Sequence, residues 1–171
     1  MLPIATADDF IERGFARRLR GRRVARRRGV LQHVLRLLVE HPGPVSREAL
    51  AQALPDFTAA RLDRELTRLD AQDHLFLQDG AVTLAYPFSA LPNAFRVRLA
   101  GGQERYACCA IDALGIAPML RQRIDVVSPC HHCGERLTFT VDPTGPEPPA
   151  ADLMVWVGQR EAGAQRVCTT L

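Results

Sequence analysis

The sequence contains no lysine, because all 22 of its Lys and Arg residues are arginines. We interpret this mainly as a coding bias, although arginine holds carboxylates and phosphates with a forked geometry that lysine lacks. No apolar run approaches the roughly 20 residues that cross a bilayer. The first ten residues, MLPIATADDF, carry acidic groups where a secretory signal would be positively charged. The sequence therefore predicts a cytoplasmic protein with no membrane partner.

Aromatic residues are scarce, at 6% of the chain, and no segment repeats. Hydrophobic residues at 47% and charged residues at 24% are ordinary for a globular protein, so composition argues against extensive disorder and names no function. A length of 171 residues suits one domain or two small ones. In the cytoplasm thiols stay reduced, so five cysteines with a single CxxC favour metal binding or thiol reactivity over a disulfide framework.

The positive charge is concentrated near the N-terminus. The formal net charge is only +3, yet nine arginines lie between Arg13 and Arg28. Residues 1–28 are predicted to form an arginine-rich helix or arm. Such an arm can bind phosphates by displacing counterions, or it can simply be a solvated helix. The lack of interleaved aromatic residues slightly favours the solvated helix.

Residues 29–86 show the pattern of three helices followed by a hairpin. Apolar residues recur at helical spacing from Val30 to Leu38, and His41-Pro42-Gly43-Pro44 ends that helix. Ser46 is expected to cap a second helix through Leu54, and Thr58 a third whose apolar stripe is Leu62, Leu66 and Leu69. Asp79-Gly80 between two strand-like runs predicts a hairpin. This order predicts a winged-helix-like domain.

Winged helices often place their last helix in the DNA major groove. The phosphate contacts would come from Arg61, Arg64 and Arg68. Neighbouring acidic residues largely neutralise this segment: Asp63, Glu65 and Asp70. Duplex DNA as a partner and a purely structural helix therefore both stay open.

Residues 87–171 change to strand-like alternation. We expect a hairpin turning at Gly101-Gly102, a helix carrying two cysteines, two strands around a Cys and His turn, and a late strand in ADLMVWVG. Met154 and Trp156 are expected in the core of that late strand. The predicted fold class is α+β, with a winged-helix-like N-terminal part followed by a small mixed sheet and a cysteine-bearing helix.

Cys109 and Asp112 are the best candidates for chemistry. They are three residues apart, so on a helix both side chains lie on one face. A free cysteine is usually only a small buried hydrophobe, as we expect for Cys108. An aspartate inside CAIDALGIAPML must be paired or kept protonated, and a neutral buried carboxyl can act as a general acid.

The run YACCAIDALGIAPML, preceded by YPFSALPNAFRVRL, resembles the organomercurial (alkylmercury) lyase family, and CAIDAL is its most specific piece. The resemblance extends from the winged-helix-like part to the end of the chain. It implies that Cys109 and Asp112 act catalytically with a second cysteine, for which QRVCTTL supplies Cys168. Because family members continue beyond this cysteine, the sequence resembles a C-terminally shortened or divergent member.

The resemblance implies cleavage of a carbon–mercury bond in an organomercurial substrate. Cys109 and Cys168 would bind the mercury, and Asp112 would protonate the departing carbon. The products would be a hydrocarbon and thiolate-bound Hg(II), with no organic cofactor and with a mercuric ion acceptor protein as a further partner. The alternative is a non-catalytic protein that binds soft metals or DNA. Acyl transfer by a cysteine nucleophile is less favoured, because it needs a positioned histidine base.

The CxxC motif, PCHHCGE, has the spacing of half a zinc site. Cys130 and Cys133 are candidate ligands for zinc or another soft metal ion. A closed zinc site needs four ligands, and the sequence offers no second CxxC. The pair could also pass metal to Cys109, remain a reduced dithiol, or join ligands from another copy. We expect His131 and His132 to be exposed turn residues.

Overall fold

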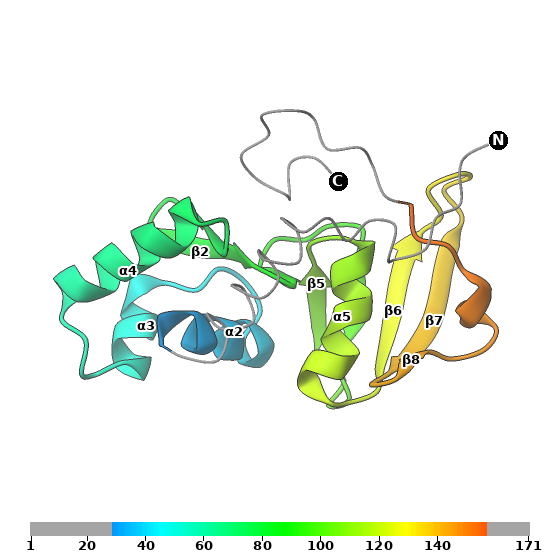
Figure 1. Cartoon of the computed structure of the whole chain (residues 1–171), viewed down its shortest axis with the longest axis horizontal. Coiled ribbons are helices and arrows are strands. Elements are labelled where there is room, and N and C mark those ends of the chain that lie inside the picture. The colour runs from blue at the N-terminus through cyan, green and yellow to red at the C-terminus, as the bar shows by residue number, and fades with distance from the viewer. Residues whose placement is uncertain (1–28, 157–171) are drawn as a thin grey trace, which may run out of the picture.

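The computed structural model describes residues 29–156. The predicted arm of residues 1–28 and Cys168 lie outside these residues. Between residues 29 and 156 the fold has four α-helices and one eight-stranded sheet, which confirms the α+β class (Figure 1). Every strand pairing in this sheet is antiparallel, so the expectation of a mixed sheet was wrong. Among the described helices, none is long and apolar enough to span a bilayer.

The first three helices lie where the sequence predicts them, and α3 and α4 begin at their predicted capping residues. Ser46 Oγ accepts a hydrogen bond from the Ala49 backbone N–H at 3.2 Å, and Thr58 Oγ1 accepts one from the Arg61 N–H at 3.3 Å. These caps satisfy donors that the first helical turn leaves open. The helices are α2 (Val30–Glu40), α3 (Arg47–Ala53) and α4 (Ala59–Ala71).

The hairpin of β1 (Leu75–Gln78) and β2 (Ala81–Ala85) follows α4, as predicted. Its turn residues Asp79 and Gly80 have φ of 50° and 80°, which suits a two-residue type I′ turn. The chain just before α3 joins this hairpin through a bridge between Val45 and Val82. The element order is therefore the one that suggested a winged helix, and domain boundaries remain predictions.

One sheet connects the helical part to the rest of the described chain. Its strand order is β1-β2-β3-β5-β4-β6-β7-β8. The short strand β3 pairs with β2 on one side and β5 on the other, so no break in the sheet falls at residue 86. The remaining strands are β3 (Phe88–Ser89), β4 (Arg96–Arg98), β5 (Glu104–Ala107), β6 (Ile124–Pro129), β7 (Arg136–Asp142) and β8 (Gly145–Pro146).

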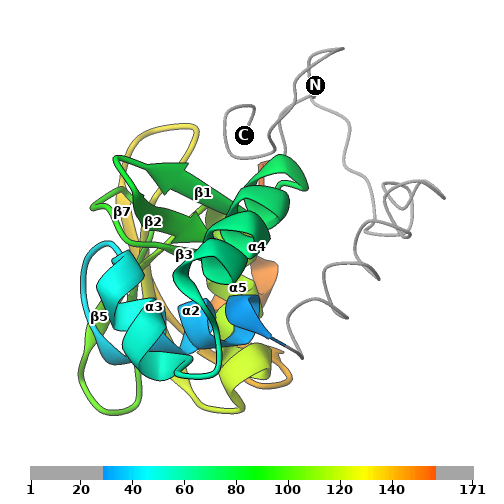
Figure 2. The same cartoon turned by 90° about the vertical axis from the view of Figure 1, so that its left-hand side faces the viewer.

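Helix α5 (Ala110–Leu120) packs against the half of the sheet that includes β5 to β8, whereas α2, α3 and α4 group beside β1 and β2 (Figures 1 and 2). Ile116 of α5 is fully buried in one hydrophobic core with Val97 and Val126. Buried residues alternate with more exposed ones along β6, so this part of the sheet has one face toward the core and one open face.

A buried arginine links α2 to the strand that leads to the cysteines. Arg105 of β5 is only 7% exposed, and its guanidinium donates to the backbone oxygens of Leu38 at 2.9 Å and Val39 at 2.7 Å. These carbonyls belong to the last turn of α2, which lacks intrahelical donors and is the negative end of the helix dipole. The arginine thus fixes β5 against α2 four residues before Cys109.

The predicted late strand was wrong over its described part. Residues 150–152 form a short 3₁₀ helix, η2 (Ala150–Asp152), and the next four residues are irregular. Met154 is 73% exposed and Trp156 is 48% exposed, so neither is a core residue. The strand that pairs with the end of β7, at Val141 and Asp142, is the short strand β8.

Candidate active site

Cys109 lies at the junction between β5 and α5. It is the N-cap of α5, with extended backbone angles of φ −155° and ψ −178°, and its carbonyl accepts the Ala113 N–H at 2.9 Å. The expectation that a helix carries both cysteines was therefore wrong. Cys108 and Cys109 precede the helix, because β5 continues almost to its first turn.

The side chains of Cys109 and Asp112 meet across the first turn of α5. The Cys109 Sγ–H donates to Asp112 Oδ2 at 3.3 Å. An N-cap residue and the third helical residue commonly face one another in this way. The juxtaposition expected from the three-residue spacing is thus present, although it arises from a helix cap rather than from two helical positions.

The Cys109 thiol holds its proton strongly. Burial, followed by the negative charge of Asp112, raises the pKa of this thiol to about 11. A helix N-terminus ordinarily lowers the pKa of a cysteine. Here desolvation and the neighbouring carboxylate outweigh that effect, so at neutral pH the pair is a thiol hydrogen-bonded to a carboxylate.

The neighbours of this pair differ in exposure. Ile111, on the same turn, is 51% exposed, which leaves an apolar side chain at the surface beside the thiol and the carboxylate. Cys108 is half-buried, and its backbone N–H donates to the Pro87 oxygen at 3.0 Å. The backbone of Cys108 is therefore held by the residue that precedes β3, and the thiol that donates to Asp112 Oδ2 is that of Cys109.

The CxxC motif forms the turn between β6 and β7. The Cys130 N–H donates to the Glu135 oxygen at 2.7 Å, and the Gly134 N–H donates to the Cys130 oxygen at 2.9 Å. Gly134 adopts φ of +75°, a conformation that favours glycine. The expected exposed turn is confirmed, because Cys133, His131 and the residues after them are exposed.

The two cysteines of this turn are already close to each other. The pKa of Cys130 is lowered, because the backbone N–H groups of Cys133 and His132 donate to its sulfur, as does the Cys133 side chain. His131 stacks on Trp156 with ring centroids 4.6 Å apart and planes 7° apart. Within residues 29–156 no group of three or more His, Cys, Asp or Glu side chains could hold a metal, so a closed zinc site has no support there.

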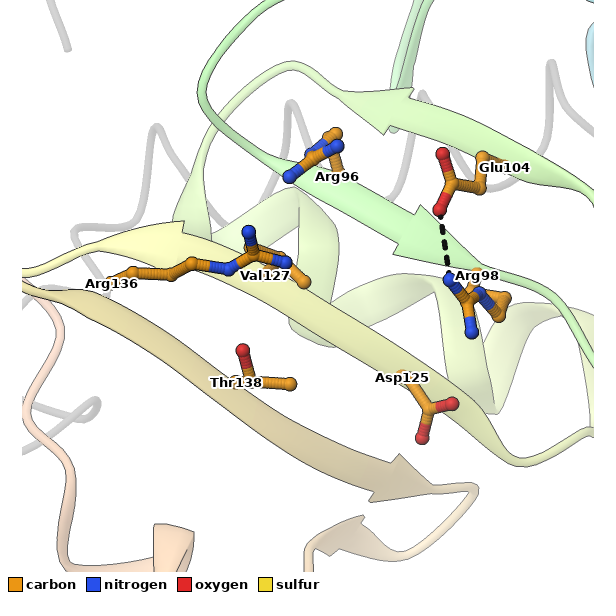
Figure 3. Close-up of a pocket in the computed structure, with 7 residues that line it drawn as sticks. All are labelled: Arg96, Arg98, Glu104, Asp125, Val127, Arg136 and Thr138. Carbon is orange, nitrogen blue, oxygen red and sulfur yellow. Dashed lines mark hydrogen bonds and ion pairs between the residues drawn. The ribbon is translucent and has the colours of Figure 1, made fainter.

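A hollow of about 250 Å³ lies on the open face of the sheet (Figure 3). Arg98 Nη2 and Glu104 Oε1 form an ion pair at 3.1 Å on its floor. Sequence reasoning missed this hollow, although the alternation of Arg96 and Arg98 with the buried Val97 was a signal for it. Its lining contains no cysteine, so it is separate from both thiol groups: Arg96, Arg98, Glu104, Asp125, Val127, Arg136 and Thr138.

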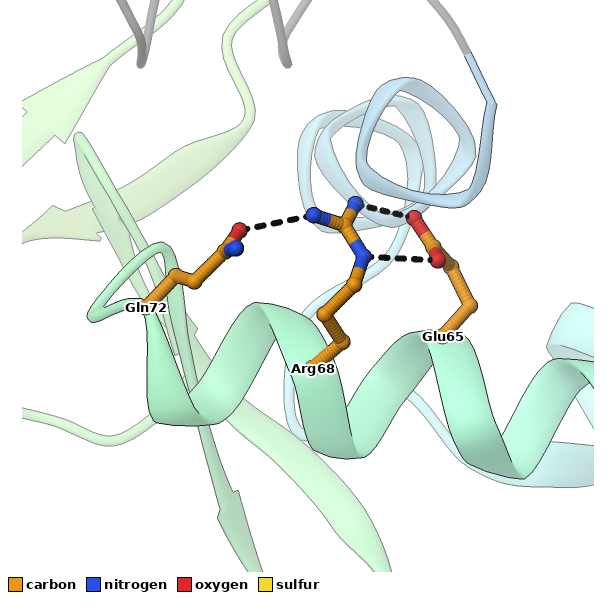
Figure 4. A network of polar contacts seen from close by, with 3 residues as sticks. All are labelled: Glu65, Arg68 and Gln72. Atoms are coloured by element: carbon orange, nitrogen blue, oxygen red, sulfur yellow. Dashed lines mark hydrogen bonds and ion pairs between the residues drawn. The ribbon is translucent and has the colours of Figure 1, made fainter.

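The three arginines considered for DNA contacts lie on the exposed face of α4. Arg68 is held within its own helix, donating through Nε to Glu65 at 2.9 Å and through Nη1 to Gln72 at 2.8 Å (Figure 4). The guanidinium carbon of Arg61 lies 4.1 Å from the centre of the Phe57 ring. Two of the three guanidinium groups therefore already have partners within the chain.

Known proteins resemble parts of this chain. A curated alkylmercury lyase of Staphylococcus epidermidis is 28% identical over 67 residues, which are 39% of this chain and 31% of that protein. A crystal structure of the mercury-bound form of MerB2 matches with a TM-score of 0.62 at 20% identity, covering 72% of this chain and 59% of that one. The similarity to MerB2 shows a shared fold. The matched segments span about a third of the curated relative and somewhat over half of MerB2.

The sequence model of the MerB family, alkylmercury lyase, matches residues 88–171. This stretch begins at β3 and includes both the Cys109–Asp112 pair and the CxxC turn. The family model, the curated relative and the shared fold agree. Residues 88–171, slightly less than half of this chain, therefore belong to the alkylmercury lyase family.

Proposed function

We propose that this protein cleaves carbon–mercury bonds by protonolysis, releasing a hydrocarbon and Hg(II). The observation that carries the proposal is the 3.3 Å hydrogen bond from the Cys109 thiol to Asp112 Oδ2. A soft sulfur ligand for mercury and a group able to carry a proton thereby lie in contact. Family membership supplies the substrate class, and Cys109, Asp112 and Cys168 are the proposed catalytic residues.

In the first step the mercury of R–Hg–X binds the Cys109 sulfur, and X⁻ leaves. The thiol proton moves to Asp112 along the hydrogen bond that already joins them. Metal coordination favours the thiolate strongly enough to overcome a high thiol pKa. The result is R–Hg bound to Cys109 beside a protonated Asp112 carboxyl, with no proton drawn from solvent.

In the second step the Asp112 proton passes to the carbon bound to mercury. The carbon–mercury bond breaks, R–H leaves, and Asp112 returns to its carboxylate form. Cys168, entering as a second thiolate after losing its proton to solvent, would raise the coordination of mercury and weaken that bond. Hg(II) then remains as a bis-thiolate until another thiol, such as one on an acceptor protein, takes it.

The raised pKa of Cys109 fits this sequence of steps. A cysteine that was already a thiolate would bind mercury without delivering a proton to Asp112. At a pKa of about 11 the thiol arrives protonated at neutral pH, and the carboxylate that receives its proton is the same group that keeps the pKa high. Thiol and carboxylate therefore act as one proton-storing unit.

The test is to incubate the reduced full chain with a simple organomercurial and measure hydrocarbon release by gas chromatography. Cys109→Ser and Asp112→Asn should each abolish release, and Asp112→Asn should still retain mercury because its thiols remain. Cys108→Ser is the matched control and should keep its rate, because the thiol that donates to Asp112 Oδ2 is that of Cys109. Release that continued in Asp112→Asn would contradict the proposed proton path.

The weaker candidate function is duplex DNA binding through α4, which rests on the element order of residues 29–86. Arg64 is the exposed arginine of the three without a contact described above, so it is the position to test first. Binding measured against salt concentration should weaken in Arg64→Ala and lose about one unit of salt slope if the phosphate contact exists. Unchanged binding in that variant would exclude this contact.

A further inference from the structure

The CxxC turn has an internal geometry that the proposed lyase reaction does not use. The pKa of Cys130 is lowered by hydrogen bonds to its sulfur from the backbone N–H groups of Cys133 and His132 and from the Cys133 side chain. Hydrogen bonds of this kind stabilise a sulfur that carries negative charge, as it does when bound to a metal. A backbone hydrogen bond from the Gly134 N–H to the Cys130 oxygen closes the turn that carries both cysteines.

We propose that Cys130 and Cys133 form a second mercury site, which binds inorganic Hg(II) as a bis-thiolate at the tip of the β6–β7 hairpin. Hg(II) is a soft ion that two thiolates are sufficient to hold, whereas a structural zinc ion takes four ligands. Binding is an exchange without redox change: two thiols of the turn replace two small thiolates on mercury, and their two protons pass to the departing ligands.

The sheet register brings this turn to the same edge as Cys109. Arg96 of β4 is paired with Tyr106 of β5 on one side and with Val127 of β6 on the other. Cys109 and Cys130 each follow three residues after these paired positions, and β5 and β6 run in the same direction. Because one strand separates β5 from β6, the two strand axes are about 10 Å apart.

This placement gives the site a role that rests on the proposed function. Mercury released from Cys109 would meet the half-buried Cys130 and the exposed Cys133 at the same edge of the sheet before it met solvent thiols. The binding itself does not depend on the lyase reaction, since it needs only the two sulfurs of the turn. The binding test can therefore be made in a chain that cannot act as a lyase.

The chain provides its own reporter for this site. It contains a single tryptophan, Trp156, which stacks on His131 between the two cysteines of the motif. A heavy ion bound in the turn should quench the fluorescence of this indole, because heavy-atom quenching acts at contact range. Mercury bound only at Cys109 should quench it much less.

The experiment titrates mercuric chloride into the reduced full chain carrying Cys109→Ser and Cys168→Ser, with millimolar glutathione as competitor. We expect saturable quenching complete at an equimolar ratio. Adding Cys130→Ser or Cys133→Ser should weaken apparent binding roughly 100-fold, because a lone thiol loses the advantage of a linked pair. Cys108→Ser on the same background is the matched control and should leave the titration unchanged.

Three results would overturn the proposal: quenching that survives both turn substitutions, quenching that disappears in the Cys108→Ser control, or displacement of mercury by equimolar Zn(II). Both turn variants should fold, because the substituted sulfurs lie at an exposed hairpin tip, and the fluorescence before mercury is added checks that His131 and Trp156 still stack. Failure of hydrocarbon release in the wild-type chain would refute the lyase proposal alone and would leave this titration as expected.

Discussion

The state of the Cys109 thiol is the most direct test of the site's electrostatics. With a pKa of about 11 this thiol is about 0.1% ionised at pH 8, whereas an ordinary cysteine is roughly a quarter ionised. Thiolates are the species that iodoacetamide alkylates. Cys109 should therefore react about 200-fold more slowly than an unperturbed thiol at that pH, and its rate should still be rising tenfold per pH unit at pH 10.

The assay follows alkylation of the Cys108→Ser variant by mass spectrometry after trypsin digestion. Cleavage at Arg105 and Arg121 then leaves Cys109 as the one cysteine of its peptide, and cleavage at Arg123 and Arg136 places Cys130 and Cys133 on another. The second peptide is an internal comparison, because the pKa of Cys130 is lowered. If the reagent merely reached the buried Cys109 sulfur slowly, the alkylation rate would fall, but the pH at which that rate levels off would not change. The pH profile therefore separates burial of the sulfur from its ionisation.

Asp112→Asn removes the second of the two main causes of the raised pKa and leaves the first, desolvation, in place. The Cys109 pKa should fall by about one unit, and its alkylation at pH 8 should accelerate about tenfold. A Cys109 profile that levelled off near pH 8.5, or one that Asp112→Asn did not move, would refute the proton-storing pair. The proposed first step would then need a different proton acceptor.

Three further predictions concern the framework around the site. Arg105→Met should lower the free energy of unfolding by about 3 kcal/mol, because the carbonyls of the last turn of α2 lose a charged donor. Chemical denaturation measures this loss, and a value below about 1 kcal/mol would contradict the role of Arg105 in fixing β5 against α2. Leu66→Ala should cost about 3 kcal/mol because Leu66 is fully buried, while the matched Leu91→Ala, at a residue 43% exposed, should change stability by less than about 0.5 kcal/mol. Between pH 9 and 11 the chain should lose stability, because the unfolded Cys109 thiol ionises near 9 and the folded one near 11; Asp112→Asn should narrow that window in pH-dependent thermal melts.

Local patterns were sufficient for most of the helices and hairpins. The spacing of Leu62, Leu66 and Leu69 and the caps at Ser46 and Thr58 predicted where α3 and α4 begin, because these signals act within one or two turns. Asp79-Gly80 predicted the first hairpin for the same reason. Sheet order was beyond such patterns, since the pairing of β3 with β5, and of β4 with β6, depends on contacts distant in sequence.

The two errors near the candidate site have a common physical cause. The apolar run through Cys109 predicted a helix there, yet the β3–β5 pairing extends β5 to Ala107, so Cys109 became a cap and gained its contact with Asp112 from that position. The apolar run ending in Trp156 predicted a strand, yet its described residues after η2 are irregular, and β8 pairs with the end of β7 at Val141 and Asp142. In both places the outcome depends on which segments pair in the sheet, which a local pattern does not contain, and Trp156 lies exposed against the CxxC turn, where it can report on mercury.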